Sequence, residues 1–340
     1  MAHIKSCLQQ HNVEHYGIAP ASTPVTYQAY CDWLDNGYAG QMDYLKEHAP
    51  LKQNPTNVVK KAQSAIVFTL PYVPHPLPIE SPIRYNRVAL YAKGMDYHFF
   101  LQSKLSEICK TLQENFAGHF FSGHTDSSPF IERDLAFQAG LGWFGKNTCT
   151  LSRSGGSLFF IAEIFTDLNL PPNLSTATNH CGKCTRCLDA CPTGAIIEPQ
   201  KLDATKCISY WTIESKKIAP EPIRNQIGDW LFGCDICQTV CPWNEKVFGK
   251  SNMHALSQPQ PVSKELIEEL QFLLSTSNKK LQKLLAPTPL SRARGSGIKR
   301  NALIVIGNLK IKELKPCVHG YLKHDRFADL ARWTLNQLEN

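Results

Sequence analysis

Apolar residues in the first half of the chain follow the patterns of alternating strands and helices. Short apolar runs typical of buried strands cover residues 64–70, 118–123 and 158–165. Residues 96–116 are predicted to form an amphipathic helix, because apolar side chains recur there at helical spacing, at Leu101, Leu105, Ile108, Leu112 and Phe116. Another helix is predicted to start near Ser128 and Pro129. It is predicted to end in the glycine-rich segment 140–145.

The residue pattern of the second half of the chain changes at a predicted linker and again where helical spacing returns. Residues 171–179 are rich in Pro, Asn, Ser and Thr, which predicts a linker. Beyond about residue 260 helical spacing returns, and it predicts helices over residues 265–274, 279–285, 298–309 and 327–338. This order predicts three domains, which are an α/β domain at 1–168, a cysteine-rich domain at 169–250 and a basic helical region at 251–340.

The composition is that of a globular protein. The 340 residues exceed the usual size of one domain, and the shares of hydrophobic (43%) and charged (19%) residues argue against disorder. No apolar stretch with a small-residue cleavage site follows Met1, so a secretory signal is not predicted. Apolar runs are too short to cross a bilayer. We therefore expect a soluble, cytoplasmic protein without a membrane partner.

The positive charge is concentrated near the carboxyl end. The net charge is +7, but residues 279–332 alone hold thirteen Lys and Arg against three acidic residues. The rest of the chain is therefore slightly acidic. A basic block on a near-neutral body indicates a polyanionic partner, and nucleic acid is the first candidate.

Thirteen cysteines need an explanation in a chain with no predicted secretory signal. Reduced thiols crowded together more often bind metal or carry out redox chemistry than form disulfides. Eight of them fall within the 61 residues 181–241. The other five are interpreted as small apolar core residues, and they are Cys7, Cys31, Cys109, Cys149 and Cys317.

The spacing of the eight crowded cysteines is that of a two-cluster ferredoxin. The first run has two residues between its first three cysteines, three before the fourth and a proline at the end, and it consists of Cys181, Cys184, Cys187, Cys191 and Pro192. The back half of this pattern recurs at Cys234, Cys237, Cys241 and Pro242. The second run lacks its first cysteine, because Leu231 occupies that position. Cys207 is the nearby cysteine that can replace it.

In two-cluster ferredoxins the last cysteine of each run ligates the other cluster. Applied here, this rule assigns to the first 4Fe-4S cluster Cys181, Cys184, Cys187 and Cys241. It assigns to the second cluster Cys191, Cys207, Cys234 and Cys237. A pair of zinc sites is the alternative, since two CxxC units suit tetrahedral zinc. Zinc does not account for the triple spacing or for the two prolines.

The acceptor of the electrons is left open by the residues alone. The spacing GxGxxG occurs at residues 140–145, but there it ends a predicted helix instead of following a strand, so a dinucleotide-binding motif is not indicated. The sequence contains no GxxxxGK[ST] motif. The nearest match to the cobalamin-ligating pattern DxHxxG begins at Asp96 and includes His98, but Leu101 stands where glycine is required. A histidine-ligated cobalamin is therefore not indicated.

Several longer segments resemble the epoxyqueuosine reductase family. The matching motifs lie within residues 91–98, 125–129, 139–147, 179–187, 206–210, 233–238 and 289–301. The resemblance implies a cobalamin, as cob(II)alamin, bound in the α/β domain without a histidine ligand. It also implies two 4Fe-4S clusters in a ferredoxin-like domain and a HEAT-like helical region that binds tRNA. The implied reaction reduces epoxyqueuosine to queuosine at the tRNA wobble position, the last step of queuosine synthesis.

Further partners follow from the implied reaction. Two electrons and two protons enter and water leaves, so an unidentified low-potential electron donor is expected. Two clusters within one chain can carry the electrons without a partner subunit, so we expect a monomer.

Asp126 is the implied proton donor, because it matches the aspartate with this role in the family. The epoxide oxygen must leave as water, so a positioned acid lowers the barrier. Burial against the corrin is expected to raise the pKa of Asp126 so that it is protonated near neutral pH. The alternative is that Asp126 only caps the helix predicted to start near Ser128.

Cobalamin contacts are predicted at Thr150, Ile208 and Ser209. Thr150 follows the glycine-rich segment 140–147, whose small residues allow a planar cofactor to approach the backbone. The alternative for this segment is an ordinary turn between a helix and a strand. Ile208 and Ser209 adjoin the predicted ligand Cys207.

Contacts with tRNA phosphates are predicted at Lys216, Lys217, Arg292, Arg294, Lys299 and Arg300. The segment 291–297 places flexible glycines between arginines, which suits a phosphate backbone. Three further lysines are interpreted as a solvated face, and they are Lys279, Lys280 and Lys283. Trp211 and Trp243 are candidates to stack on a splayed base, with burial beside the clusters as the alternative.

Two rival functions share part of this pattern. A reductive dehalogenase also combines cobalamin with two clusters, but it is usually exported behind a twin-arginine signal and has no need of a basic tail. A non-catalytic electron carrier leaves the α/β domain and the basic tail without a purpose. We therefore favour the tRNA-modifying enzyme.

Overall fold

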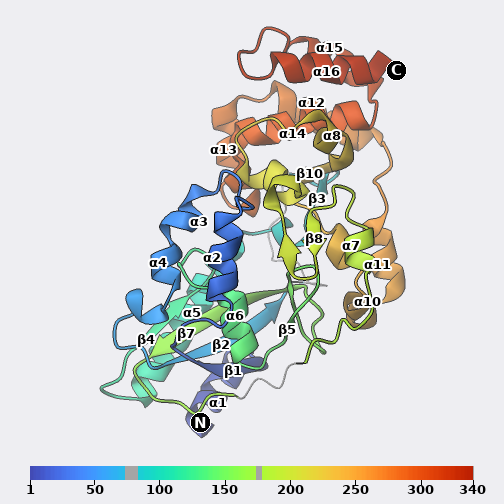
Figure 1. Ribbon diagram of the computed structural model, residues 1–340. Coiled ribbons are helices and arrows are strands. Elements are labelled where there is room, and N and C mark those ends of the chain that lie inside the picture. The colour runs from blue at the N-terminus through green and yellow to red at the C-terminus, as the bar shows by residue number, and fades with distance from the viewer. Residues whose placement is uncertain (73–82, 174–177, 340) are drawn as a thin grey trace.

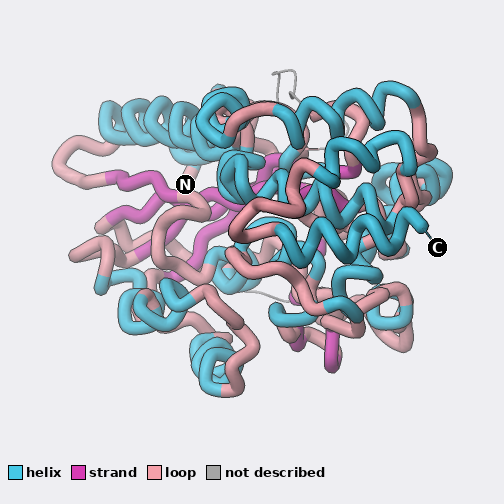
Figure 2. The backbone as a smooth tube through the Cα atoms, turned by 90° about the horizontal axis from the view of Figure 1, so that it is seen from above, coloured by secondary structure: helices cyan, strands magenta, loops and turns pink. Residues whose placement is uncertain are grey.

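The computed structural model describes residues 1–72, 83–173 and 178–339 (Figure 1). A β-sheet lies near the amino terminus, and the helices of the last third lie at the opposite end (Figure 1). Viewed from above, the central strands gather on one side and the carboxyl-terminal helices on the other (Figure 2). Within the three described ranges no helix is long and apolar enough to cross a membrane.

A four-stranded antiparallel sheet forms the centre of the amino-terminal half. Its strands, in spatial order, are β1 His15–Pro20, β2 Ser64–Pro71, β7 Phe159–Thr166 and β4 Phe121–His124. The two inner strands, β2 and β7, pair along their whole length. The strands predicted at 64–70 and 158–165 are confirmed, and β4 begins at Phe121 rather than at residue 118. The strand β1 was not predicted.

Helices cover both faces of this sheet, with α1 Ala2–Gln10 and α5 Tyr97–Asn115 on one face and α6 Glu132–Gln138 on the other. Alternate residues of β2 point to the two faces, as the period of a strand requires. Ile66 and Phe68 pack with α1 and α5, whereas Ala65 and Val67 pack with α6. All four side chains are fully buried. The inner strands therefore hold both helical layers in place.

The two predicted helix starts have different outcomes. The helix predicted over 96–116 is confirmed as α5, and Asp96 caps it by accepting the backbone N–H two residues on. The start predicted near Ser128 is wrong, because α6 begins at Glu132. Ser128 instead accepts the backbone N–H of Phe130 within a turn.

The remaining elements before the last third are short. Between β1 and β2 lie α2 Tyr27–Asp35, α3 Asp43–Glu47 and α4 Ala49–Lys52. After α6 come the paired strands β5 Trp143–Phe144 and β6 Thr150–Leu151. The cysteine-bearing segment contains α7 Arg186–Asp189, β8 Ile196–Glu198, β9 Lys201–Leu202, α8 Glu221–Ile227, β10 Trp230–Phe232, α9 Ile236–Thr239, α10 Pro242–Phe248 and α11 Lys250–Ser257. The predicted linker has no regular structure at 171–173 and 178–179, and its residues 174–177 lie outside the described residues.

The four helices predicted in the last third are confirmed. They are α12 Lys264–Ser275, α13 Asn278–Leu285, α14 Arg294–Asn308 and α16 Ala328–Glu339, with the short α15 Lys315–His319 before the last. Helix α14 is the central one, because α12, α13 and α16 all pack against it. Most of its residues between Ile298 and Gly307 are buried. The HEAT-like arrangement stays a prediction.

One hydrophobic core joins the last third to earlier parts of the chain. It combines buried residues of 83–92, 208–232 and 266–338. In it β10 pairs in parallel with the two-residue strand β3 Arg87–Val88, and α14 packs on β10. The side chain of Asn301 in α14 donates to the carbonyls of Thr212 and Leu231, at 2.8 Å each. The boundaries predicted for the three domains stay a prediction.

The Asn301 side chain is expected to be the main polar link across this core. Replacing Asn301 with Ala leaves two buried carbonyls without donors, at a cost of about 1–3 kcal/mol for each unsatisfied group. We expect the apparent melting temperature of the protein to fall by several degrees. The control is Asn252→Ala, which removes an exposed side chain that also donates to a carbonyl. Equal melting temperatures for the two variants would contradict this expectation.

Candidate active site

The eight crowded cysteines come from separate elements that pack together. Cys181 and Cys184 precede α7, which contains Cys187, and Cys237 lies in α9. Because α7 packs against α9, the two runs lie side by side. Cys241 forms the amino-terminal cap of α10, with Pro242 as its first residue. That position explains the proline, since Pro is favoured in the first turn of a helix.

The electrostatic environment of the thiols sorts them into two groups. Burial raises the pKa of Cys187 to about 11, and the neighbouring thiols Cys241, Cys181 and Cys184 add to the effect. Burial also raises the pKa of Cys234, to which Cys207 and Cys191 contribute. The neighbours of Cys237 include Cys234 and Cys207. These neighbours match the two predicted ligand sets, and the ligation itself stays a prediction.

A ninth thiol lies next to the second group. Cys149 shares a hydrogen bond with Cys237, which lowers the pKa of Cys149 and raises that of Cys237. Cys149 is therefore not the isolated core residue that we expected. Cys7 and Cys109 are buried among apolar side chains, in agreement with their interpretation. Only the folded chain reveals the special position of Cys149, because no local spacing relates it to the two runs.

The donor set is that of iron–sulfur clusters. Within the described residues no three His, Cys, Asp or Glu side chains are arranged to hold a single metal ion. An iron–sulfur cluster distributes its four thiolates around a cube of iron and sulfide instead. Eight cysteines in two groups, each with a member from the other run, match in number the four thiolates that each predicted cluster requires.

Asp126 lies in the loop that follows β4, in a strained backbone conformation with φ 35°. Its carboxylate accepts hydrogen bonds from the Tyr97 hydroxyl and from Nε2 of His98, the latter at 3.0 Å. Its backbone N–H donates a hydrogen bond to the carboxylate of Glu132. Asp126 therefore does not cap α6, and the alternative that we considered for it is wrong. The side chain is 53% exposed, so a substrate can reach it.

His98 lies between two carboxylates. Its Nδ1 is 2.7 Å from Asp96, and its Nε2 faces Asp126. The hydrogen bonds with Asp126 and Asp96 raise the pKa of His98 to about 9, against the opposing effect of burial. His98 is therefore an imidazolium at neutral pH. The motif that most nearly matched a cobalamin-ligating pattern is engaged with Asp126 instead.

The pKa of Asp126 differs from our expectation. Burial opposes its ionisation, but the hydrogen bonds from His98 and Tyr97 and the charge of Arg292 outweigh burial and lower the pKa. The rise expected from burial against a corrin stays a prediction. The proton of this group of side chains resides on His98 rather than on Asp126.

Two further acidic residues near Asp126, Glu132 and Glu163, have raised pKa values. Burial and the nearby charge of Asp126 raise the pKa of Glu132 to about 8. Glu163 in β7 is fully buried, and neither of its carboxylate oxygens has a hydrogen-bond partner within the described residues. Burial and the neighbouring Glu132 raise its pKa as well. Both carboxyl groups are therefore protonated more readily than exposed ones.

The predicted cobalamin contacts have different environments. Thr150 in β6 is buried, and its hydroxyl has no hydrogen-bond partner within the described part of the chain. A cofactor that accepts a hydrogen bond fits such an orphaned hydroxyl. Ser209 is half-buried, whereas the side chain of Ile208 is 2% exposed and packs in the core around β10. A contact of Ile208 with a ligand would have to use its backbone, whose carbonyl already accepts from the Thr212 hydroxyl at 2.8 Å.

Close backbone packing explains a glycine in the segment 140–147. A Cβ atom on Gly142 would lie 2.1 Å from the carbonyl oxygen of Leu151. Glycine is therefore required for the close pairing of β5 with β6. This agrees with the alternative of an ordinary turn and does not depend on a cofactor.

The predicted phosphate contacts differ in their exposure to solvent. Four of them are exposed, and they are Lys216, Lys217, Arg292 and Arg294. Lys299 is half-buried, with its ammonium 5.8 Å from the centre of the Tyr321 ring. The prediction for Arg300 is wrong, because the residue is 3% exposed and its guanidinium donates to the carbonyls of Trp211, Ser215 and Lys217. Arg300 therefore binds the backbone of the loop that carries Lys216 and Lys217.

Arg292 connects the basic surface to Asp126. It pairs with both oxygens of Glu214, at 3.0 and 2.9 Å, and its guanidinium lies 5.5 Å from the ring of Tyr44. Its charge is among those that lower the pKa of Asp126. The basic surface and the predicted proton donor therefore belong to one region of the molecule.

The two candidate stacking residues are held by protein contacts. The indole N–H of Trp211 donates to the carbonyl of Thr205 at 2.7 Å. Trp243 packs edge-to-face on Trp143, with ring centres 4.9 Å apart. Both arrangements favour the alternative of burial over base stacking. Lys279, Lys280 and Lys283 are exposed, in agreement with a solvated face.

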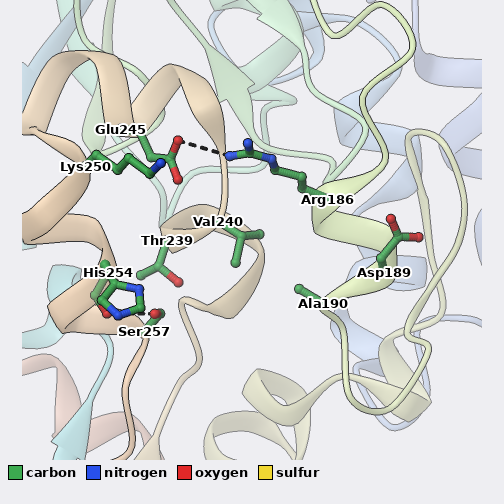
Figure 3. A pocket seen from close by; sticks show the side chains of 9 residues that line it. All are labelled: Arg186, Asp189, Ala190, Thr239, Val240, Glu245, Lys250, His254 and Ser257. Carbon is green, nitrogen blue, oxygen red and sulfur yellow. Dashed lines mark hydrogen bonds and ion pairs between the residues drawn. The ribbon is translucent and has the colours of Figure 1, made fainter.

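A separate hollow of about 440 Å³ lies between α7, α9, α10 and α11 (Figure 3). Arg186 and Glu245 form an ion pair of 3.0 Å across its rim. His254 and Lys250 line the same hollow from α11 (Figure 3). None of its described lining residues was predicted as a site residue, so the hollow adds nothing to the predicted chemistry.

Comparison with known proteins gives a consistent result. Residues 180–244 match the family model of the 4Fe-4S double cluster binding domain. Residues 52–127 match the model described as epoxyqueuosine reductase QueG, DUF1730. The chain is 38% identical to the epoxyqueuosine reductase of Cyclobacterium marinum, over 79% of this chain and 84% of that protein. It is 37% identical to that of Pseudomonas aeruginosa, over 81% and 76% respectively.

Solved structures with the same fold include two epoxyqueuosine reductases. One, from Bacillus subtilis, has its catalytic aspartate loop swung out of the active site, and it matches with a TM-score of 0.82 and 26% identity over 98% of this chain and 90% of that one. The other contains an epoxyqueuosine-modified tRNA stem loop. It matches with a TM-score of 0.82 and 26% identity over 99% and 90%.

Proposed function

This chain belongs to the epoxyqueuosine reductase family of oxidoreductases, and we propose that it reduces epoxyqueuosine to queuosine at the wobble position of tRNA. This reaction is the last step of queuosine synthesis. The position of Asp126 carries the proposal, because an exposed carboxyl group is held by His98 and Tyr97 beside a basic surface. The relative solved with a modified tRNA stem loop supports tRNA as the substrate.

Electrons reach the substrate site through two 4Fe-4S clusters. The match to a double cluster domain supports their presence. The first is held by Cys181, Cys184, Cys187 and Cys241, and the second by Cys191, Cys207, Cys234 and Cys237. The source of the electrons is a low-potential donor that gives them one at a time. The chain acts as a monomer in the cytoplasm.

Cobalamin binds in the α/β domain, and Thr150, Ser209 and the backbone of Ile208 contact it. The unpartnered hydroxyl of Thr150 supports this assignment. When bound, cobalamin supplies a cobalt centre that delivers electrons to the substrate carbon. His98 is not a cobalt ligand, because both of its ring nitrogens are engaged by carboxylates.

Asp126 protonates the epoxide oxygen as its bond to carbon breaks. Without a proton the oxygen would leave as an anion, which is a poor leaving group, so a positioned acid lowers the barrier. Two electrons and two protons enter in total, the oxygen leaves as water, and a carbon–carbon double bond is formed.

The basic residues Lys216, Lys217, Arg292 and Arg294 bind the phosphates of the anticodon stem loop, with Lys299 at their edge. Arg292 is exposed with this surface and its charge acts on Asp126, so a wobble nucleotide held here lies within reach of the acid. The wobble base has to leave its stack to reach it.

Replacing Asp126 with Asn is expected to reduce turnover at least ~100-fold, because the amide cannot donate a proton as an acid. The measurement is mass analysis of nucleosides from epoxyqueuosine-containing tRNA treated with protein, cobalamin and a low-potential reductant. The matched control is Asp167→Asn, since Asp167 also pairs with a histidine, His119. Queuosine formation by the Asp126 variant at the normal rate would remove Asp126 as the donor.

Replacing Cys207 with Ser is expected to lower the iron content from about eight to about four per chain, because the second cluster loses a thiolate. Iron analysis and electron paramagnetic resonance of anaerobically purified protein measure the change. Cys317→Ser is the control, since Cys317 lies in α15 among the carboxyl-terminal helices. Zinc in place of iron in the unmodified protein would overturn both cluster assignments.

Replacing Lys216 and Lys217 together with Ala is expected to weaken the binding of a tRNA stem loop. The slope of log K against log salt should become shallower by about 0.7 for each lost phosphate contact. Titrations at several salt concentrations measure the slope. Lys279→Ala with Lys280→Ala is the control, because both lysines are exposed on α13. An equal effect of the two pairs would show that only the overall charge matters.

A further inference from the structure

His98 occupies a position that the proposed reaction does not yet use. It is the second residue of α5, and its ring lies between Asp96 and Asp126, which come from different parts of the chain. A cation at the amino end of a helix is normally unfavourable, because the helix dipole is positive there. Asp96 offsets this effect, since one of its oxygens accepts both the backbone N–H and the ring Nδ1 of His98.

We propose that His98, held by Asp96, stores the proton that Asp126 gives to the epoxide oxygen. This inference rests on the proposed function, because it concerns the source of the proton in that reaction. His98 acts through Asp126 and does not touch the substrate. It is therefore a positioning residue, and Asp126 remains the catalytic acid.

The charge distribution of the group supports this role. An acid can donate only if it carries a proton, yet the hydrogen bonds from His98 and Tyr97 lower the pKa of Asp126 against the opposing effect of burial. The pKa of His98 is raised to about 9, so the transferable proton resides on its imidazole at neutral pH. The two groups share one proton across a distance of 3.0 Å, and they titrate as a pair.

Substrate binding provides the reason for the proton to move. The Asp126 side chain is 53% exposed, so a nucleotide placed over it removes much of its water. Desolvation disfavours the ionised carboxylate and raises its pKa. The proton then passes from Nε2 of His98 to the nearer carboxylate oxygen of Asp126. An imidazolium–carboxylate pair becomes a neutral imidazole and a carboxylic acid.

The step balances with the reaction as a whole. The proton of the Asp126 carboxyl group passes to the oxygen while the carbon–oxygen bond breaks, and the carboxylate is left behind. The two electrons come from the low-potential donor, and the second proton comes from solvent. His98, whose side chain is 29% exposed, then regains a proton from water.

Other ionisable groups around Asp126 do not supply its proton. The Tyr97 hydroxyl donates to the same oxygen, but burial and the charge of Asp126 raise its pKa so far that it keeps its proton. Glu132 meets the backbone N–H of Asp126 rather than its carboxylate. Arg292 acts on Asp126 through its charge and is held by Glu214. Lys52 donates to the carbonyl of Phe130, and Glu163 is fully buried in β7.

The test is the pH dependence of a single turnover on epoxyqueuosine-containing tRNA, with reductant in excess. For the unmodified protein we expect a constant rate up to pH about 9, followed by a decline as His98 loses its proton. For His98→Gln we expect a rate that falls with rising pH throughout the interval from pH 6 to pH 8, because Asp126 must then take its proton from water. The loss at pH 8 relative to pH 6 should be on the order of 10- to 100-fold.

The control variant is His119→Gln, which removes a histidine paired with Asp167 away from Asp126. Its pH profile should equal that of the unmodified protein. A variant of His98 whose rate is reduced by the same factor at every pH, or not at all, would overturn the inference. Such a result would mean that His98 has only a structural role and does not supply the proton. Glu132→Gln tests whether Glu132, instead of His98, supplies the proton to Asp126. A pH profile that shifts in this variant but not in His98→Gln would also overturn the inference.

A second measurement does not depend on turnover. Nuclear magnetic resonance titration of ¹⁵N-labelled histidines should show one imidazole with a pKa of about 9, absent in His98→Gln. This pKa should fall in Asp96→Asn and in Asp126→Asn, because each removes a carboxylate that stabilises the cation. An ordinary pKa for His98 would overturn the inference. If the unmodified protein forms no queuosine, the proposed function fails, and the titration alone then decides whether His98 stores a proton.

Discussion

The close approach of α7 and α9 is the contact on which the rest of the site depends. It places thiols from the two cysteine runs within each other's electrostatic reach, although the runs are more than forty residues apart. Each run contributes one cysteine to the group formed mainly by the other, so neither group is complete unless both runs are folded. The shared core of β10 and α14 fixes the second run and its neighbour Cys207.

Aromatic side chains connect the thiols with the acid. Tyr72 lies near Cys149, and its ring centre is 4.8 Å from that of Phe160. Phe160 stacks on Tyr97, with ring centres 4.4 Å apart, and the Tyr97 hydroxyl reaches Asp126. The cysteine groups and the proton donor are thus joined by a continuous series of packed aromatic side chains. Strain at the Asp126 backbone is compatible with this arrangement, because the hydrogen bonds to its carboxylate and to its N–H hold the loop in place.

The wrong prediction for Arg300 and the unexpected pKa of Asp126 have a common physical origin. Arg300 and Arg294 belong to the same basic segment, yet one is buried under a loop while the other is exposed. The distinction depends on carbonyls of residues 211–217, which the local sequence does not contain. The same holds for the pKa of Asp126, which is set by His98 and Tyr97 from a different helix. The misplaced start of α6 has a local cause, because the turn at Ser128 competes with a cap.

The sequence by itself determined the elements and groups whose physics is local. Cysteine spacing, the apolar period of α5 and the concentration of basic residues each depend on neighbours within a turn or two, so they could be read directly. The tertiary structure alone decided which distant groups meet, among them Cys149 with Cys237 and His98 with Asp126. The physical reason is that hydrogen bonding and burial depend on distance in space, and long-range packing of the chain sets that distance.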